Sequence, residues 1–456
     1  MTDRTTLLPG INRRELLQVG CSGLLGLTLP TVFGDSTSAA QPTSGKSVIL
    51  VFQSGGGSHL DTFDPKPEAP DNTRGEFGVI DTTLPGIKFS EHVPHLAKRT
   101  DQLAIVRSMA HSDNRHLSGT HNTLTGSVQP FRGDANEDKE LNRGDWPNYG
   151  GALNYLAPRN NGLPSHVTLS NPLIEGTLTW PGQHAGFLGA AHDPWGLNSD
   201  PNSDNFKVGG LALPDGLSVS RLQSRQQLLT RYNVQNGNLD NWARKQQFTS
   251  QQQTAYTLLT SGKVAKAFDI KRESDKMRER YGRNKSGQTL LLARRLVQAG
   301  VPVVQCNMGI VQSWDTHTDN WGKLKNRLLP GLDLGVSALL DDLTEQGMID
   351  DTLVIVVGEF GRSPRISKLT VNDKPGRGHW AWCYTAVFAG GGVKGGQVIG
   401  ASDRIGGYPR TPPYHPNDLG ATVYRTLGIE PRTTLPDKLG RPIMLNAGNV
   451  MDALYG

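Results

Sequence analysis

The stretch VILVFQSGGGSHLD, residues 48–61, decides the fold that we expect. Its first five residues are apolar without a break, which is typical of a strand buried on both faces of a parallel sheet. Three glycines then indicate a turn, and His59 and Asp61 follow it. Because open α/β sheets bind ligands at the carboxyl ends of their strands, this stretch predicts both a central strand and the edge of a site.

Further apolar runs and helical patterns extend this arrangement in both directions along the chain. The runs cover residues 103–106, 301–304, 353–357 and 385–388. A helix is expected over Thr289 to Gln298 with Gly300 as its stop, and another where apolar residues recur at helical spacing from Leu332 to Leu343. The alternation of strands and helices predicts an α/β fold, with a large, mostly parallel central sheet and helices on both faces.

Domain organisation follows from where this alternation is interrupted. We expect one domain over residues 41–456, because apolar runs recur to its end. The stretch at about 194–287 differs, being polar and rich in Gln, Asn, Ser, Arg and Lys. We interpret it as a helical insert or cap beside the sheet.

The first forty residues have the pattern of an export signal. Arg13 and Arg14 precede an apolar stretch, residues 16–33, which glycines interrupt, and small residues at 38–40 offer a cleavage site. This predicts a twin-arginine signal peptide over residues 1–40, and hence a periplasmic or extracellular protein with no membrane span after cleavage.

Composition excludes some classes of function. The formal net charge is +5 among 456 residues, and the basic residues are scattered, which argues against nucleic-acid binding. Of three cysteines, only Cys306 and Cys383 lie beyond the predicted signal. Cys306 ends an apolar strand and Cys383 lies beside Trp382 in another, so we expect buried small hydrophobes in place of a disulfide framework or a thiolate zinc site.

Titratable residues gather after the predicted strands. The candidates are His59 and Asp61, then His111, His116 and His121, then Asp315 and His317, then Glu359 and Arg362, and finally His379. Each alone has a plainer interpretation, since Asp315 could cap a turn, Glu359 a helix, and His59 could stabilise the glycine turn. Together they predict a metal site, and histidine with carboxylate but without thiolate favours zinc or manganese over calcium or magnesium.

Several motifs carry a family resemblance. They are SGGGSHLDTFDPKP, RGEF, the RSMAH segment with its later TG, WDTH, GEFGRSP, GRGHW and AGGGVKGG. Together, over about residues 46–445, they resemble the domain-of-unknown-function 1501 family, an exported bacterial family allied to the alkaline phosphatase and sulfatase superfamily. The resemblance implies an alkaline phosphatase-like fold with metal ions at the strand ends.

The resemblance also implies metal ligands. Glu359 stands where the superfamily has the Asp of its Asp-His pair. Asp315 and His317 resemble the other Asp-and-His pair, and His379 resembles the late metal-binding histidine. After the first strand the superfamily has aspartates directly, whereas here the nearest candidates are His59 and Asp61.

The largest departure from the superfamily concerns the nucleophile. The sulfatase ending Leu-Thr-Gly is kept at residues 124–126, but His116 stands at the nucleophile's position and Thr120 at the arginine's. A histidine can bind metal, act as acid or base, or be phosphorylated, but it cannot become formylglycine. We expect it at a helix N-terminus, whose N–H donors would favour the neutral imidazole. His121 is the second catalytic candidate.

Residues that contact substrate are also expected near the strand ends. Ser58, at the glycine turn, His184, in a segment resembling one that contacts the anion in sulfatases, and Arg362 are the candidates for substrate binding. The expected function is an exported metal-dependent hydrolase of phosphate or sulfate esters, with an anionic ester or a sulfated or phosphorylated glycan as substrate. The alternatives are a non-catalytic metal-binding scaffold and a carbohydrate-binding or surface-assembly protein.

Overall fold

The structure is a computed structural model that describes residues 44–130, 138–159, 161–208 and 262–456, with a few residues between 220 and 228. The chain divides into residues 1–42 and a compact unit of residues 43–456. The predicted signal peptide lies outside the described residues, and the fold and the candidate site belong to the second unit.

The centre of this unit is an eight-stranded sheet with the order β14-β4-β13-β10-β1-β9-β5-β8. Strand β1 (Ser47–Phe52) lies between β9 (Val303–Asn307) and β10 (Thr352–Val357) and is parallel to both. Every residue of β1 and β10 is buried. The continuous apolar run of residues 48–52 is therefore the middle of the sheet, as predicted.

The outer strands extend the sheet on both sides. They are β5 (His166–Leu169) and β8 (Trp195–Leu197) beyond β9, and β13 (Tyr384–Ala389), β4 (Ala104–Met109) and β14 (Gln397–Ile399) beyond β10. Strand β13 is antiparallel to both of its neighbours, whereas the other pairings are parallel. The carboxyl ends of β1, β4, β9 and β10 consequently meet at one edge.

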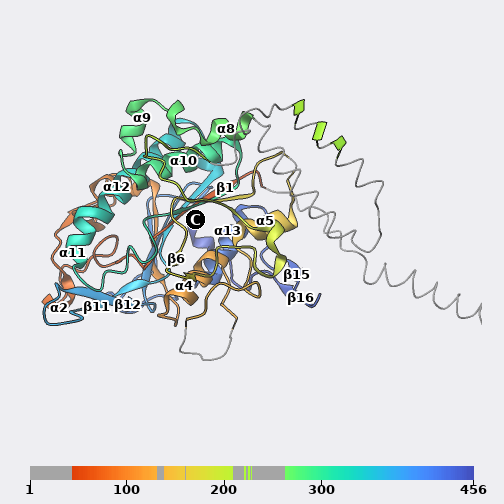
Figure 1. The fold of residues 1–456 in the computed structure, drawn as a ribbon. Coiled ribbons are helices and arrows are strands. Elements are labelled where there is room, and N and C mark those ends of the chain that lie inside the picture. The colour runs from red at the N-terminus through yellow and green to blue at the C-terminus, as the bar shows by residue number, and fades with distance from the viewer. Residues whose placement is uncertain are drawn as a thin grey trace, which may run out of the picture. The chain divides into compact units, whose positions relative to one another are not determined.

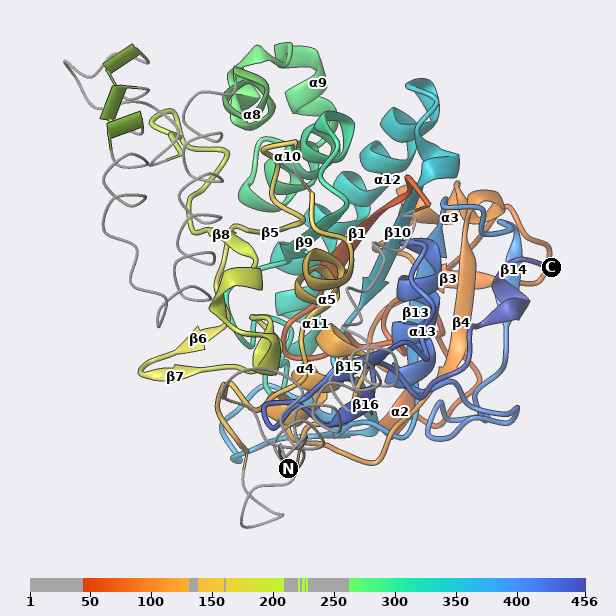
Figure 2. The same cartoon turned by 90° about the vertical axis from the view of Figure 1, so that its right-hand side faces the viewer.

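Helices cover both faces of the sheet, which confirms the predicted α/β class. One face carries α3 (Pro94–Ala97), α8 (Gly262–Phe268), α10 (Lys285–Ala299) and α12 (Leu329–Glu345). The other carries α4 (His116–Thr125), α5 (Tyr149–Leu156) and α13 (Pro416–Thr426), which lie toward the viewer in Figure 2. Along β1, Ile49 and Val51 join the first core and Leu50 joins the second.

Helix boundaries have identifiable local causes. The side chain of Asn284 caps α10 by accepting a hydrogen bond from the Gly287 amide, and Gly300 ends that helix with φ +103°. Helix α12 continues α11 (Asn320–Lys323) through a π-helical segment, η6 (Leu324–Leu328). Figure 1 shows α11 and α12 following one another beside α10.

Smaller elements surround this frame. They are α2 (Asp71–Arg74), β2 (Val79–Asp81), β3 (Lys88–Ser90), β6 (Ile174–Glu175), β7 (Leu178–Thr179), α9 (Asp275–Arg280), β11 (Gly361–Ser367), β12 (Gly376–Trp380), β15 (Thr434–Pro436) and β16 (Pro442–Met444). Short 3-10 helices are η1 (Thr100–Gln102), η2 (Gly186–Leu188), η3 (Ala190–His192), η5 (Ile270–Arg272), η7 (Ile349–Asp351) and η8 (Asp452–Leu454).

The stretch at about 194–287, expected as a helical insert or cap, contributes to several parts of the fold. Its first residues form β8 and so belong to the central sheet, while α8 and α9 pack against α10. Most of the part between residues 209 and 261 lies outside the described residues. Cys306 and Cys383 are buried free thiols, as expected. No helix among the described residues has the length and apolar character needed to cross a lipid bilayer.

Candidate metal centre

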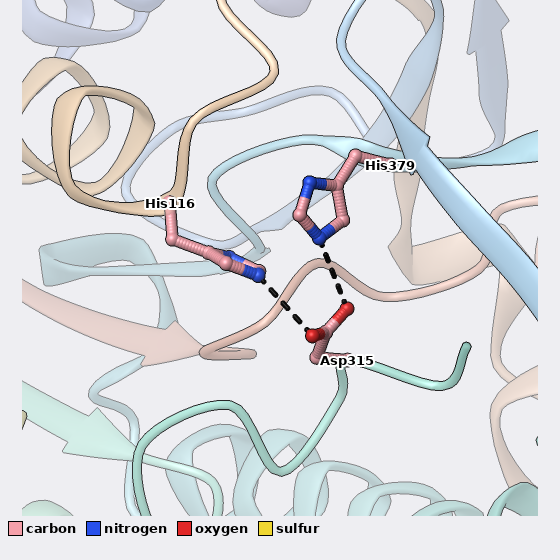
Figure 3. Close-up of side chains that lie close together, drawn as sticks. All are labelled: His116, Asp315 and His379. Atoms are coloured by element: carbon pink, nitrogen blue, oxygen red, sulfur yellow. Dashed lines mark ion pairs between the residues drawn. The ribbon is translucent and has the colours of Figure 1, made fainter. Parts of the chain in front are cut away.

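Three segments that are distant in the sequence bring His116, Asp315 and His379 together at the carboxyl edge of the sheet. His116 is the first residue of α4, Asp315 lies in the loop after β9, and His379 lies in β12. One ligand atom from each residue lies within 4.8 Å of the other two. Figure 3 shows both imidazole rings pointing at the Asp315 carboxylate, each toward a different oxygen.

The ligand atoms of this cluster lie at ion-pair distance from one another but make no well-formed hydrogen bonds. His116 Nε2 is 3.3 Å from Asp315 Oδ2, and His379 Nε2 is 3.2 Å from Asp315 Oδ1. Nevertheless His116 Nε2, His379 Nε2 and Asp315 Oδ1 are buried and make no hydrogen bond of acceptable geometry. Buried polar atoms without partners are costly and uncommon. Three of them converging on one point fit a bound cation.

Both histidines are held with Nε2 toward the cluster. His379 Nδ1 lies 2.9 Å from the carbonyl oxygen of Asn114, which can only accept, so Nδ1 carries the proton. His116 Nδ1 lies 2.8 Å from Oε1 of Glu359. An imidazole that donates through Nδ1 presents the lone pair of Nε2, which is the arrangement found in metal-binding histidines.

His317 adds a fourth candidate ligand at the more open side. Its Nε2 lies 3.1 Å from Asp315 Oδ1, and its ring packs edge-on against His379 with 4.6 Å between the centroids. Its side chain is 28% exposed, against 7% for His116. His317 therefore lies where the cluster meets solvent.

Glu359 is a support of the cluster in this arrangement. Its carboxylate is fully buried and accepts hydrogen bonds from the Gly55 amide, at 2.8 and 3.0 Å, as well as contacting His116. Gly55 has φ +107°, and a Cβ there would lie 2.4 Å from the Asp315 amide nitrogen. Glycine is thus needed at this position, because a side chain would collide with the backbone of Asp315 where the Gly55 amide donates to Glu359.

Arg362, expected to contact substrate, is fully enclosed. Its guanidinium NH1 is 2.5 Å from Asp315 Oδ1, Nε donates to the Gly56 carbonyl at 3.0 Å, and NH2 contacts the Gly55 carbonyl. Burial lowers the pKa of this guanidinium, and the carboxylate of Asp315 opposes that effect. Arg362 neutralises Asp315 and ties it to the glycine turn.

Electrostatics at His116 correct one expectation. Burial acts to lower the pKa of the imidazole, but Asp315 and Glu359 outweigh it and raise that pKa to about 9. Burial acts to raise the pKa of Asp315, while the three histidines and Arg362 hold it well below its usual range. The prediction of a neutral imidazole considered only the helix N–H donors. It is wrong in the absence of a metal ion, because the two carboxylates raise the pKa of His116. A cation has to displace this proton on binding.

The residues predicted after β1 form a separate network. Ser58 Oγ donates to Asp61 Oδ2 at 2.5 Å, and Arg377 contacts both carboxylate oxygens at 2.7 and 3.2 Å. Asn320 Nδ2 and Trp321 Nε1 each donate to Asp61 at 3.0 Å. The carboxylate is saturated, so we do not include Asp61 or Ser58 in the metal centre.

Three other histidines that the sequence predicted as site residues, His59, His121 and His184, form hydrogen bonds with the backbone outside the cluster. His59 Nε2 lies 2.9 Å from the Gly406 carbonyl. His121 Nδ1 lies 3.0 Å from the Ser127 carbonyl, and its Nε2 accepts from the Trp146 amide at 3.3 Å. His184 Nδ1 accepts from the Gly186 amide at 3.0 Å. The structure thus uses them to connect loops.

Sequence reasoning missed the groups that fix the ring of His116. Trp180 stacks on it with 5.2 Å between centroids, and Phe360 packs on it at 5.0 Å. Phe360 follows Glu359 directly, so its proximity could have been expected from that motif. Trp180 follows the hairpin of β6 and β7, and no pattern in the sequence connects that hairpin with α4.

Comparison with known proteins identifies the family of the chain. The family described as "Protein of unknown function (DUF1501)" matches residues 45–455. The chain belongs to this family. The resemblance stated from the motifs is thereby confirmed, and the candidate centre is a feature of one DUF1501 protein. Among curated proteins, none matches this DUF1501 chain.

Solved structures that resemble the chain do so distantly. Ps i-CgsB in complex with k-i-k-neocarrahexaose has a TM-score of 0.39 and 11% identity, with 84% of this chain and 72% of that one covered. PsFucS1 sulfatase from Pseudoalteromonas sp. has a TM-score of 0.34 and 13% identity, with 92% of this chain and 72% of that one covered. The alkaline phosphatase from the Antarctic bacterium TAB5 has a TM-score of 0.34 and 12% identity, with 85% of this chain and 98% of that one covered. Likenesses of this size support no conclusion about chemistry.

Proposed function

We propose that this DUF1501 protein is a metal-dependent hydrolase of phosphate or sulfate esters, exported to the periplasm or the cell exterior. A divalent cation is held by His116, Asp315 and His379, with His317 as a further ligand. The single observation that carries the proposal is the convergence of buried Nε2 and Oδ1 atoms that make no well-formed hydrogen bond. Imidazole and carboxylate ligands without thiolate favour zinc or manganese.

When bound, such a cation would supply Lewis acidity toward a phosphoryl or sulfuryl oxygen. The chain's own residues prepare the site for it. Glu359 holds the Nδ1 proton of His116, Asn114 holds that of His379, and Arg362 balances the charge of Asp315. The geometry favours His116 as a ligand over a nucleophile, because its Nε2 faces Asp315 at 3.3 Å.

The substrate in this proposal is an anionic ester, carried by a sulfated or phosphorylated glycan. Its support is the sequence resemblance together with a centre suited to an anion, because a divalent cation and the guanidinium of Arg362 together outweigh the carboxylates of Asp315 and Glu359. Export is supported by Arg13, Arg14 and the small residues at 38–40.

The test begins with the metal content of the purified protein, followed by hydrolysis of 4-nitrophenyl phosphate and 4-nitrophenyl sulfate. We expect about one zinc or manganese per chain and activity that chelation removes. The variant His379→Gln should lose both, whereas His95→Gln, at an exposed histidine outside the centre, should keep both. Full metal content and turnover in His379→Gln would refute the assignment.

A second candidate function is a non-catalytic metal-binding scaffold. The observation that favours it is the enclosure of Arg362, whose guanidinium is occupied by Asp315 and backbone carbonyls and is not presented to a ligand. A protein that binds one metal through the same residues but hydrolyses neither ester nor a sulfated glycan would establish this alternative.

A further inference from the structure

A cavity of about 450 Å³ is lined in part by residues that follow Asp315 and His317 in the chain. Its lining includes Asp319 and Trp321, together with Phe77 and Lys374. The volume falls within the range of small-molecule sites, about 300–1,000 Å³. In Figure 1, the elements next to it, α2, α11, β11 and β12, lie together at one side of the unit.

Two chain segments connect the cavity with the metal centre. In residues 315–321, Asp315 and His317 belong to the centre, while Asp319 and Trp321 line the cavity. In residues 374–379, Lys374 lines the cavity and His379 belongs to the centre. Backbone hydrogen bonds join these two segments, from the Asp319 amide to the Lys374 carbonyl at 3.3 Å and from the Arg377 amide to the Thr316 carbonyl at 3.1 Å. The same two segments therefore contribute residues to both the cavity and the centre.

The backbone around the cavity is locally unusual. Asp319 has φ +50°, a conformation that costs energy for a residue other than glycine. A Cβ on Gly322 would lie 2.5 Å from the Asp319 carboxylate. The π-helical segment η6 follows and contributes Lys325 to the lining. Such π-segments and strained residues concentrate at functional sites.

The lining of the cavity has three carboxylates, two ammonium groups and an apolar wall. Phe77, Trp321 and Pro375 supply that wall. The carboxylates belong to Glu76, Glu91 and Asp319 and the ammonium groups to Lys325 and Lys374, and Asp319 Oδ1 lies 3.3 Å from Lys374 Nζ. Such a lining offers no excess positive charge to an anion, yet it offers both donors and acceptors. Among small ligands, a neutral sugar ring has matching properties, with hydroxyl groups on its rim and an apolar face.

We propose that this cavity binds a neutral sugar unit of a glycan whose ester group lies at the metal centre. The identity of the substrate rests on the proposed function, whereas the sugar-binding property of the cavity does not. The RGEF motif, which supplies Glu76 and Phe77, gains a role in this way.

The test is calorimetric titration of the metal-loaded full chain with a neutral galactan hexasaccharide. The variants are Phe77→Leu, which removes the ring, and Lys374→Ala, whose side chain is 75% exposed and so does not threaten folding. Each should weaken binding about tenfold, which corresponds to the loss of one good contact. Lys368→Ala, at an exposed lysine outside the cavity lining, is the matched control and should bind as the wild type does.

The outcomes separate this inference from the proposed function. A wild type that contains metal and hydrolyses the 4-nitrophenyl esters but does not bind the hexasaccharide would overturn the cavity assignment alone. Equal binding by wild type, Phe77→Leu and Lys374→Ala would also overturn it. Hexasaccharide binding that both variants weaken, in a protein without metal or ester hydrolysis, would uphold the sugar site while refuting the hydrolase.

Discussion

The metal centre and the Asp61 network are built from similar residues but differ in how their polar atoms are satisfied. In the network, Arg377, Ser58, Asn320 and Trp321 occupy the carboxylate of Asp61. In the centre, buried atoms of His116, Asp315 and His379 face one another without hydrogen bonds. The comparison teaches that a buried carboxylate after a strand is a candidate ligand where its oxygen makes no hydrogen bond, even when an arginine lies beside it as Arg362 does here.

The largest expected effect concerns the stability of the saturated network. Asp61→Ala would leave the fully buried Arg377 without its partner, so the free energy of unfolding should fall by about 3–5 kcal/mol. Urea denaturation of the metal-free protein measures this. The control is Asp71→Ala, which breaks the exposed pair with Arg74 and should cost less than about 1 kcal/mol.

The variant His379→Gln tests the stability of the candidate metal centre, for comparison with the Asp61 network. Because its buried Nε2 makes no hydrogen bond in the chain, its loss should change the unfolding free energy of metal-free protein by less than about 1 kcal/mol. A loss as large as that of Asp61→Ala would show that the two regions do not differ in the way described.

A pH titration of stability sharpens the same contrast. Burial acts to raise the pKa of Asp61, but Arg377 and the hydrogen bonds hold it below its usual value. A lowered folded-state pKa stabilises the protein above the unfolded-state value, near 4, and this stabilisation is lost as pH falls further. The stability difference between wild type and Asp61→Asn should therefore shrink below about pH 4. A difference that stays constant down to pH 2 would contradict this.

Glu359→Gln should have an intermediate effect, on metal affinity. The amide keeps the size of the side chain but holds the Nδ1 proton of His116 less strongly, so affinity should fall by about 10–100-fold. Competition with a chromogenic chelator measures it. An unchanged affinity would mean that Glu359 does not orient the histidine.

His317→Gln should have the smallest effect of the series. Its side chain is more exposed than that of His116, so the loss of this ligand should reduce metal affinity less than the Glu359→Gln change does. The same chelator competition gives the order of the two variants. A larger effect for His317→Gln would place this residue at the heart of the centre.

The sequence predicted the frame of the molecule well because that frame depends on continuous apolar runs. Residues 48–52 and 353–357 were expected as central strands, and both are. The site was less predictable, because ligands after a strand look alike whether their partners come from nearby or from afar. Asp61 and Asp315 both follow buried strands, yet Arg377, a residue more than three hundred positions away, decides the role of Asp61.

Anomalous diffraction from crystals of the purified full chain, collected at the zinc and manganese edges, tests the central claim most directly. We predict one strong peak within bonding distance of His116 Nε2, the Asp315 carboxylate and His379 Nε2, about 2.0–2.2 Å for zinc. A peak bound instead by Asp61 and His59, or crystals grown with either metal that show none at His116, Asp315 and His379, would contradict it.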